Sequence, residues 1–318
     1  MNEQSPTTIN RRNFIGSASL LTAGIAMFPK SIFAQAESPV ITITKAAKTA
    51  KINIIKLRGS ISMLEGSGGN IAVLTGTEGK LLVDTGIGVS KHNIMAALDS
   101  VSKAPIKFLI NSHWHFDHAD GNEWLHQAGA MIIAQDVTRK HLAETTRVDD
   151  WNYTFPPHHA AGLPTLLYKS EHKHHFNGEN ILIRTYPHAH TDGDSSIFFS
   201  NANILHVADT FWNSYYPFID YSTGGNIKGM IKAAQMNIDR TTKDTIIIPG
   251  HGPAGNRQQL IEFHDMLLAI FEKVSALKKQ GRSMEQVVAA RPTSTYDAKF
   301  GGFAINGDFF TRLVYKGA

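Results

Sequence analysis

Histidine and aspartate are concentrated in one short stretch of the chain. Positions 113–118 read His-Trp-His-Phe-Asp-His. Side chains two residues apart in an extended segment face the same way, so His113 and His115 can converge on one metal ion. A turn of the chain would then direct Asp117 and His118 at a second ion. Imidazole and carboxylate are zinc ligands, and a catalytic zinc keeps a position open for water. The stretch therefore predicts a metal centre suited to hydrolytic chemistry.

Two buried strands are expected to position this stretch. The apolar run Ile106–Ile110 predicts a strand that ends directly before it, and Lys80–Asp84 predicts another strand, with a helix from Ser90 to about Ser102 between the two. Asp84, at the end of its strand, has two interpretations. It either accepts hydrogen bonds and orients the metal ligands, or it is an ordinary turn aspartate.

The rest of the chain predicts one domain over residues 37–318 with two sheets covered by helices. Further strands are expected at 52–63, 71–75, 130–134, 181–186, 195–199, 204–207 and 245–248, and further helices at 119–127, 136–146, 227–236 and 257–279. Residues 147–170 are aromatic, contain prolines and lack a regular pattern, which favours a functional loop such as a lid.

The N-terminus predicts an export signal over residues 1–36. An Arg-Arg pair at positions 11–12 precedes an apolar run at 14–28, and Ala-Gln-Ala at 34–36 supplies a cleavage site. The arginine pair resembles the twin-arginine signal, so we expect a periplasmic or secreted protein. A membrane anchor is the alternative, but the run is short for a span and ends at Pro29-Lys30. No stable membrane span is expected after cleavage.

Composition excludes several classes of function. The formal net charge is +4, of which residues 1–36 contribute +2, and no basic stripe with interleaved aromatics is present. We therefore expect no nucleic-acid partner and a small-molecule substrate. The absence of cysteine excludes disulfides, thiolate metal ligands and a cysteine nucleophile. The sequence does not indicate the oligomeric state.

The stretch Asn-Ser-His-Trp-His-Phe-Asp-His at 111–118 resembles the H-x-H-x-D-H signature of the metallo-β-lactamase superfamily. The resemblance extends over nearly all of the mature chain. It includes Asp-Thr-Gly at 84–86, His-Thr-Asp-Gly-Asp at 190–194, Ala-Asp-Thr at 208–210 and Pro-Gly-His-Gly at 249–252. It implies an α/β (α+β) fold, the four-layer αββα metallo-β-lactamase sandwich, with the site at the edge between the sheets.

The resemblance also implies a ligand set for two zinc ions per chain. His113, His115 and His190 would hold one ion, Asp117, His118 and His251 would hold the other, and Asp209 would bridge them. His190 is chosen over His188 because Thr-x-Gly-Asp follows it. His188 would then support the ligands from outside. Asp117 would also act in catalysis, because its free oxygen could orient the nucleophile or pass a proton to the leaving group.

The implied function is hydrolysis by a hydroxide that the two ions share. Its target would be the carbonyl of an ester, lactone, thioester or β-lactam. Asp209 stands where one type of β-lactamase carries cysteine, and the all-histidine lactamases lack a bridging carboxylate there. The chain is therefore more similar to the glyoxalase II, lactonase and phosphodiesterase branches. Export argues against a cytosolic glutathione thioesterase.

Two other functions stay open. Persulfide dioxygenases share the motif but use a single iron, held by the equivalents of His113, His190 and Asp209, and the sequence allows that chemistry. A non-catalytic binding protein on the same fold is the second alternative. The complete ligand set argues against it, because a decayed site is expected to lose ligands.

Aromatic side chains near the expected site loops are candidates for contacts with the substrate, although each could instead pack in the core. The candidates are Trp114, Phe116, Trp151, Tyr153 and Trp212. His172, His174 and His175 are interpreted as surface or adventitious metal-binding residues. The aromatic C-terminal segment either packs on the domain or forms an oligomer interface.

Overall fold

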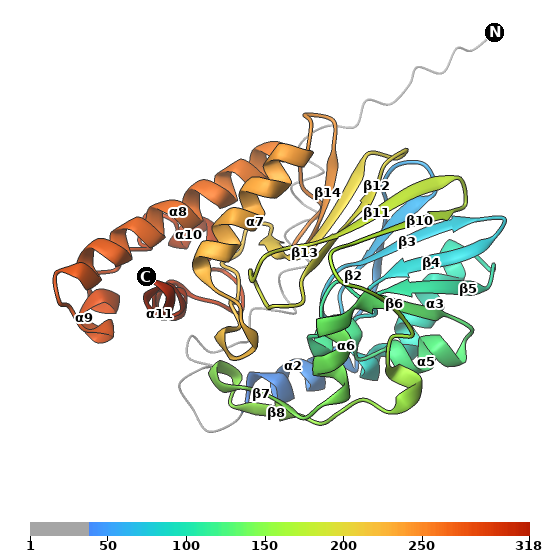
Figure 1. Cartoon of the computed structure of the whole chain (residues 1–318), viewed down its shortest axis with the longest axis horizontal. Helices are drawn as coiled ribbons and strands as arrows, with labels where there is room; N and C mark the ends of the chain where they lie inside the picture. Colours follow the sequence, from blue (N-terminus) through green and yellow to red (C-terminus); the bar gives the residue numbers. More distant parts are fainter. Residues whose placement is uncertain (1–37) are drawn as a thin grey trace, which may run out of the picture.

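The computed structural model describes residues 38–318, and two β-sheets that pack face to face form its centre (Figure 1). In this part of the chain the first sheet has the strand order β1 (Asn53–Lys56), β2 (Ile61–Glu65), β3 (Ile71–Gly76), β4 (Gly79–Val83), β5 (Ile106–Ile110), β6 (Met131–Gln135) and β9 (Leu166–Tyr168). The second has the order β10 (Glu171–Phe176), β11 (Glu179–Thr185), β12 (Ser195–Phe199), β13 (Ile204–Trp212) and β14 (Ile246–His251). Strands β4, β5, β6 and β9 are parallel, as are β13 and β14.

Strand alternation explains why both faces of the first sheet are apolar. On β4, Leu81 and Val83 face the second sheet and pack with residues such as Ile183 and Phe199. Leu82, between them, faces the other way and packs with Leu98 on a helix. Because successive side chains on a strand point to opposite faces, a strand that is covered on both sides must be apolar throughout.

Helices cover the outer face of each sheet (Figure 1). Helices α3 (Lys91–Val101), α5 (Asn122–Gln127) and α6 (Asp136–Ala143) lie on the first sheet, and α7 (Ile227–Arg240) and α8 (Arg257–Lys279) lie on the second. Ile94 and Leu125, on helices of the first group, are buried against the first sheet, and Met230 and Phe263, on α7 and α8, are buried against the second. The predicted four-layer αββα sandwich is confirmed.

The C-terminal segment packs on the domain. Helices α9 (Met284–Ala289), α10 (Asp297–Phe300) and α11 (Gly307–Gly317) lie beside α8. Phe310, Leu313 and Val314 on α11 are fully buried in the same core as α7 and α8. The sequence left two interpretations of this segment open, packing on the domain or an oligomer interface. The buried side chains are explained by packing on the domain.

The segment between α6 and β9 is more ordered than a lid loop. It contains a small hairpin of β7 (Thr146–Val148) and β8 (Tyr153–Phe155). Helix α2 (Pro39–Ala47) lies beside this hairpin in Figure 1, and the Ser38 hydroxyl donates a hydrogen bond of 2.7 Å to the Trp151 carbonyl.

Two further expectations concern the N-terminal part of the chain. The single strand expected over 52–63 is wrong, because Gly59, with φ of +59°, turns the chain and separates β1 from β2. The signal peptide predicted for residues 1–36 lies outside the described residues. None of the helices within residues 38–318 is long and apolar enough to cross a membrane.

Candidate metal centre

Both sheets contribute predicted ligands at one edge of the sandwich. The 113–118 stretch directly follows β5 and leads into the short helix α4 (Phe116–Ala119), which carries Asp117 and His118. From the second sheet, His190 lies between β11 and β12, Asp209 lies within β13, and His251 is the last residue of β14. The structure brings all seven predicted ligands together.

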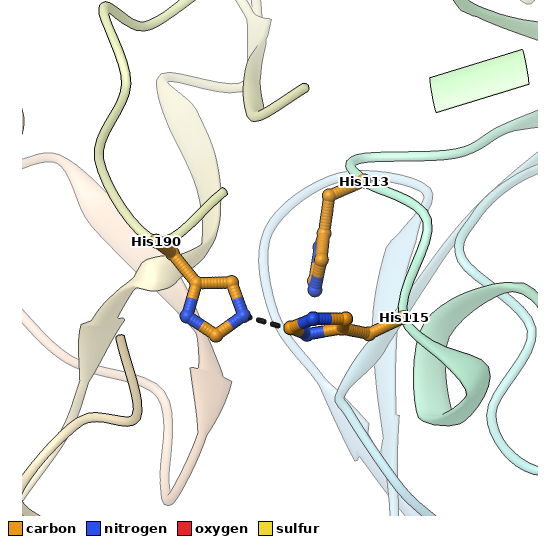
Figure 2. Close-up of side chains that lie close together, drawn as sticks. All are labelled: His113, His115 and His190. Carbon is orange, nitrogen blue, oxygen red and sulfur yellow. Dashed lines mark hydrogen bonds between the residues drawn. The ribbon is translucent and has the colours of Figure 1, made fainter. Parts of the chain in front are cut away.

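Three histidines converge in the first half of the site. Figure 2 shows the rings of His113, His115 and His190 directed toward one another. The Nε2 atom of His190 lies 2.8 Å from Nδ1 of His115, and one ring nitrogen from each of the three lies within 4.8 Å of the others. All three side chains are buried, with at most 1% of their surface exposed. This is the geometry of a tri-histidine metal site.

Asp209 connects this half to the second half. Its Oδ2 atom lies 3.3 Å from His190 Nε2 and 3.5 Å from His251 Nε2, and its Oδ1 lies 3.0 Å from His118 Nε2. Asp117 completes the second group, with its Oδ2 atom 3.2 Å from His251 Nε2 and 3.6 Å from His118 Nε2. One carboxylate thus touches both groups of histidines.

Four of the histidine rings form a hydrogen bond on the side that faces away from the centre of the site. These bonds determine which ring nitrogen carries no proton. Three of the partners are carboxylates or a carbonyl, which can only accept, and the fourth, the Ser112 hydroxyl, already donates its proton to Asp84. The ring therefore donates in each case, and the opposite nitrogen of a neutral ring carries the lone pair. The partners are Ser112 Oγ for His113 Nδ1 (3.1 Å), Asp220 Oδ2 for His115 Nε2 (3.0 Å), Asp84 Oδ2 for His118 Nδ1 (2.8 Å) and the Phe218 carbonyl for His190 Nδ1 (2.9 Å). In every case the free nitrogen is the one that faces the centre.

Several buried polar atoms that face the centre of the site have no hydrogen-bond partner. Nε2 of His113, Nε2 of His118 and Oδ1 of Asp209 are buried and have no hydrogen bond. The last two are in contact, but without hydrogen-bond geometry. Buried polar atoms are normally satisfied. Lone pairs and carboxylate oxygens that converge without donors fit a bound cation, and this donor set of imidazoles and carboxylates fits zinc.

Burial and neighbouring charges set the protonation of the candidate ligands. Burial, reinforced by the neighbouring histidines, holds the pKa of His113 well below its usual value, so its ring is neutral, as a ligand must be. Burial opposes charge on Asp209, but His118 and His251 nevertheless hold the pKa of this carboxyl well below its usual range. Burial likewise opposes charge on His251 and His118, yet the Asp209 and Asp117 carboxylates raise the pKa of His251 to about 9 and that of His118 well above its usual value. A metal ion that binds these two rings would therefore displace a proton from each.

Asp84 has the orienting position. Its carboxylate is fully buried and accepts hydrogen bonds from the Ser112 amide (2.8 Å), the Ser112 hydroxyl (2.7 Å) and His118 Nδ1. His188, expected to support the ligands, is instead exposed and bonds to Gly224 and Asn226. The reason is that the chain reverses at this point, which turns His190 inward and His188 outward.

The carboxylate that sequence reasoning missed is Asp220. It accepts a hydrogen bond from His115 and another from Thr223 (2.7 Å). Although burial raises the pKa of Asp220, its contact with His115 lowers it below the ordinary value, so the group is a carboxylate. Only the spacing Asp-x-x-Thr at 220–223, an N-terminal turn of a short helix, could have drawn attention to it.

The predicted aromatic contacts divide into two groups. Trp212 and Trp151 lie against ligands, with ring centroids 4.2 Å from His251 and 4.8 Å from His115. Trp114 is buried, and its N–H donates to Thr223. Phe116 and Tyr153 pack in the small cluster beneath α2. The position of Trp114 therefore favours packing in the core over recognition.

A family comparison identifies the fold and the motif together. The model of the metallo-beta-lactamase superfamily matches residues 64–252, which is more than half of the chain and includes all seven converging residues. The chain belongs to the metallo-beta-lactamase superfamily. The comparison with curated proteins gave no match.

Solved structures of this superfamily share the fold at low identity. A metallo-beta-lactamase from Pontibacter korlensis is 17% identical, with a TM-score of 0.57 over 69% of this chain and 99% of that one. The DIM-1 metallo-beta-lactamase is 19% identical, with a TM-score of 0.54 over 68% and 97%. The inverting sec-alkylsulfatase Pisa1 from Pseudomonas sp. is 15% identical, with a TM-score of 0.61 over 90% of this chain. The match spans 54% of that sulfatase, about half its length.

The contact between Asp220 and His115 predicts a loss of metal affinity in Asp220→Asn. Removing the charge weakens the acceptor that orients the ring, and changes of this kind lower metal affinity by about 10- to 100-fold. Competition with a chromophoric chelator measures the affinity. Asp239→Asn, at an exposed position on α7, is the matched control and should bind metal as the wild type does. Equal affinity in both variants would contradict the role of Asp220.

The close approach of Gly69 to His118 predicts a second effect. A Cβ atom at Gly69 would lie 2.1 Å from the His118 ring, whereas one at Gly302 would meet nothing within 4 Å. Neither glycine has a positive φ, so only the space differs. Gly69→Ala should displace His118 and lower the metal content of the purified protein, while Gly302→Ala should not. Equal metal content in both would show that the loop yields without disturbing the ligand.

Proposed function

We propose that this protein is a binuclear zinc hydrolase. The observation that carries the proposal is the position of Asp209, which contacts His190 of one group and His118 and His251 of the other. A single-ion site needs no carboxylate between two complete groups of ligands. His113, His115 and His190 would hold one ion, and Asp117, His118 and His251 the other.

Two zinc ions would supply a hydroxide nucleophile at neutral pH and polarise the bond that is attacked. The remaining work falls to the protein. Asp117 directs Oδ2 at His118 and His251, which leaves its second oxygen for a hydrogen bond to the nucleophile. In hydrolysis an oxygen–carbon bond would form at the carbonyl, and the bond from that carbon to the oxygen, sulfur or nitrogen of the leaving group would break. The proton that the nucleophile loses passes through Asp117 to the leaving group.

The proposed substrates are esters, lactones, thioesters and β-lactams. The structural neighbours include β-lactamases and a sulfatase, so sulfate esters belong in the same screen. An iron-dependent oxygenase reaction is the competing outcome, because His113, His190 and Asp209 are also present for a single iron.

Metal content and one ligand variant test this proposal. Purified residues 37–318 should contain about two zinc ions per chain by inductively coupled plasma mass spectrometry. Asp117→Ala should lower kcat/KM by about 100-fold or more, because it removes a ligand and the proton carrier. Asp265→Ala, on the exposed face of α8, should leave it unchanged. About one iron per chain, with oxygen uptake in the presence of a persulfide, would replace the hydrolase by the oxygenase.

We further propose that the protein is exported by the twin-arginine route. The proposal rests on the Arg-Arg pair, the apolar run and the Ala-Gln-Ala site in residues 1–36. Arg12→Lys should leave the full-length protein in the cytoplasm of a host that has this route, as judged by fractionation and immunoblotting. Unchanged export of the variant would reject this signal type.

A further inference from the structure

Solvent reaches the ligand set from one side. The side chains of His251 and Asp117 are 10% and 12% exposed, whereas those of His113, His115, His118 and His190 are at most 1% exposed. A substrate must therefore approach past His251 and Asp117. The residues beside this opening decide which substrates fit.

Aromatic rings surround the exposed ligand His251. Its ring lies 4.2 Å from that of Trp212 and 6.1 Å from that of Phe303, and Phe303 lies 4.7 Å from Tyr215. Phe303 is half-buried and belongs to the segment between α10 and α11. This segment lies outside residues 64–252, the part of the chain that the family model matches.

A second aromatic group lies at the tri-histidine half. The half-buried Trp151 contacts His115 and stacks on Phe218 at 4.6 Å. Trp151 is also held in place by Ser38, which donates to its carbonyl. Both halves of the site thus have an apolar ring beside a ligand.

The charges near the ligands are histidines and aspartates. Among the described residues, each ion pair that a ligand forms joins a histidine to an aspartate, and none includes a lysine or an arginine. Two cations close to Trp151 form ion pairs with the aspartates that precede it. Lys316 pairs with Asp150, and Arg147 pairs with Asp149. Burial raises the pKa of Tyr215, whose ring packs on Phe303, and the Glu65 carboxylate raises it further.

These surroundings disfavour an anionic group outside the metal centre. A carboxylate that leaves water needs a cation or several hydrogen-bond donors in return. An aromatic or aliphatic group, in contrast, is stabilised when it is buried against apolar rings. The cost of burying a carboxylate and the gain from burying an apolar group both favour an uncharged substrate.

Resting on the proposed hydrolase function, we propose that the site takes uncharged esters or lactones. Their aryl or alkyl group packs against Phe303 and Trp212, and substrates that carry a carboxylate, such as β-lactams, are disfavoured. Phe303 is the specificity-determining residue. Water adds to the acyl carbon, the carbon–oxygen bond to the leaving group breaks, and that oxygen takes up the proton, so no further reactant is needed.

Matched esters test the charge preference with the zinc-loaded wild type. 4-Nitrophenyl hexanoate and mono-4-nitrophenyl adipate share a leaving group and differ mainly in one carboxylate. The neutral ester should have a kcat/KM at least about tenfold higher, since a tenfold ratio corresponds to about 1.4 kcal/mol. Equal values, or a preference for the adipate, would overturn the inference while leaving the hydrolase intact. If neither esters, lactones nor the other carbonyl substrates are cleaved, the proposed function itself fails.

Phe303→Ala tests the aromatic contact. It should lower kcat/KM for 4-nitrophenyl phenylacetate about fivefold or more relative to 4-nitrophenyl acetate, mainly through KM, because apolar contact with the phenyl group is lost. Phe271→Ala, a half-buried ring on α8, is the matched control and should leave the ratio unchanged. Binding of phenylacetamide, followed by tryptophan fluorescence, should weaken in Phe303→Ala and be retained in Phe303→Leu. An unchanged ratio and unchanged binding in Phe303→Ala would remove Phe303 from substrate recognition.

Discussion

A carboxylate that is fully buried must be satisfied by donors, and Asp84 obtains them only if the 113–118 stretch has one conformation. The two hydrogen bonds from Ser112 fix the start of that stretch, and the bond from His118 fixes its end. One group at the end of β4 therefore sets the direction of a ligand and the path of the chain that carries the others. Asp84 itself has a φ of +66°, a conformation that few residues other than glycine adopt and that the surrounding bonds maintain.

The site also depends on the packing of two sheets, because neither sheet holds a complete set of ligands. Asn70, at the start of β3, donates to the carbonyls of Pro249 (2.9 Å) and Gly252 (2.8 Å) on either side of His251. At Gly250, a Cβ atom would lie 1.9 Å from the Asp209 carboxylate. The backbone of β14 therefore has to approach Asp209 closely, and a side chain at position 250 is excluded.

Local features of the sequence predicted much of this arrangement. The apolar runs gave the strands β5 and β12 and the helix α8 with their observed bounds, and ligand-type residues at strand ends gave the metal centre. The roles of Asp220 and Phe303 could not be predicted in this way. Asp220 meets His115 across 105 residues of sequence, and Phe303 reaches His251 only because α11 packs on α8. Contacts of this kind depend on how the layers pack, and no spacing along the chain encodes that.

The separation of the ligands from Trp151 and Phe303 has an evolutionary consequence. The ligands lie on or next to strands whose neighbours admit little change, as the glycines at positions 69 and 250 illustrate. Trp151 and Phe303 lie on connecting segments that carry no ligand. Substitutions there can alter which molecules are accepted while leaving the reaction chemistry unchanged. A lineage with this architecture can therefore acquire new substrates by single mutations without passing through an inactive ancestor.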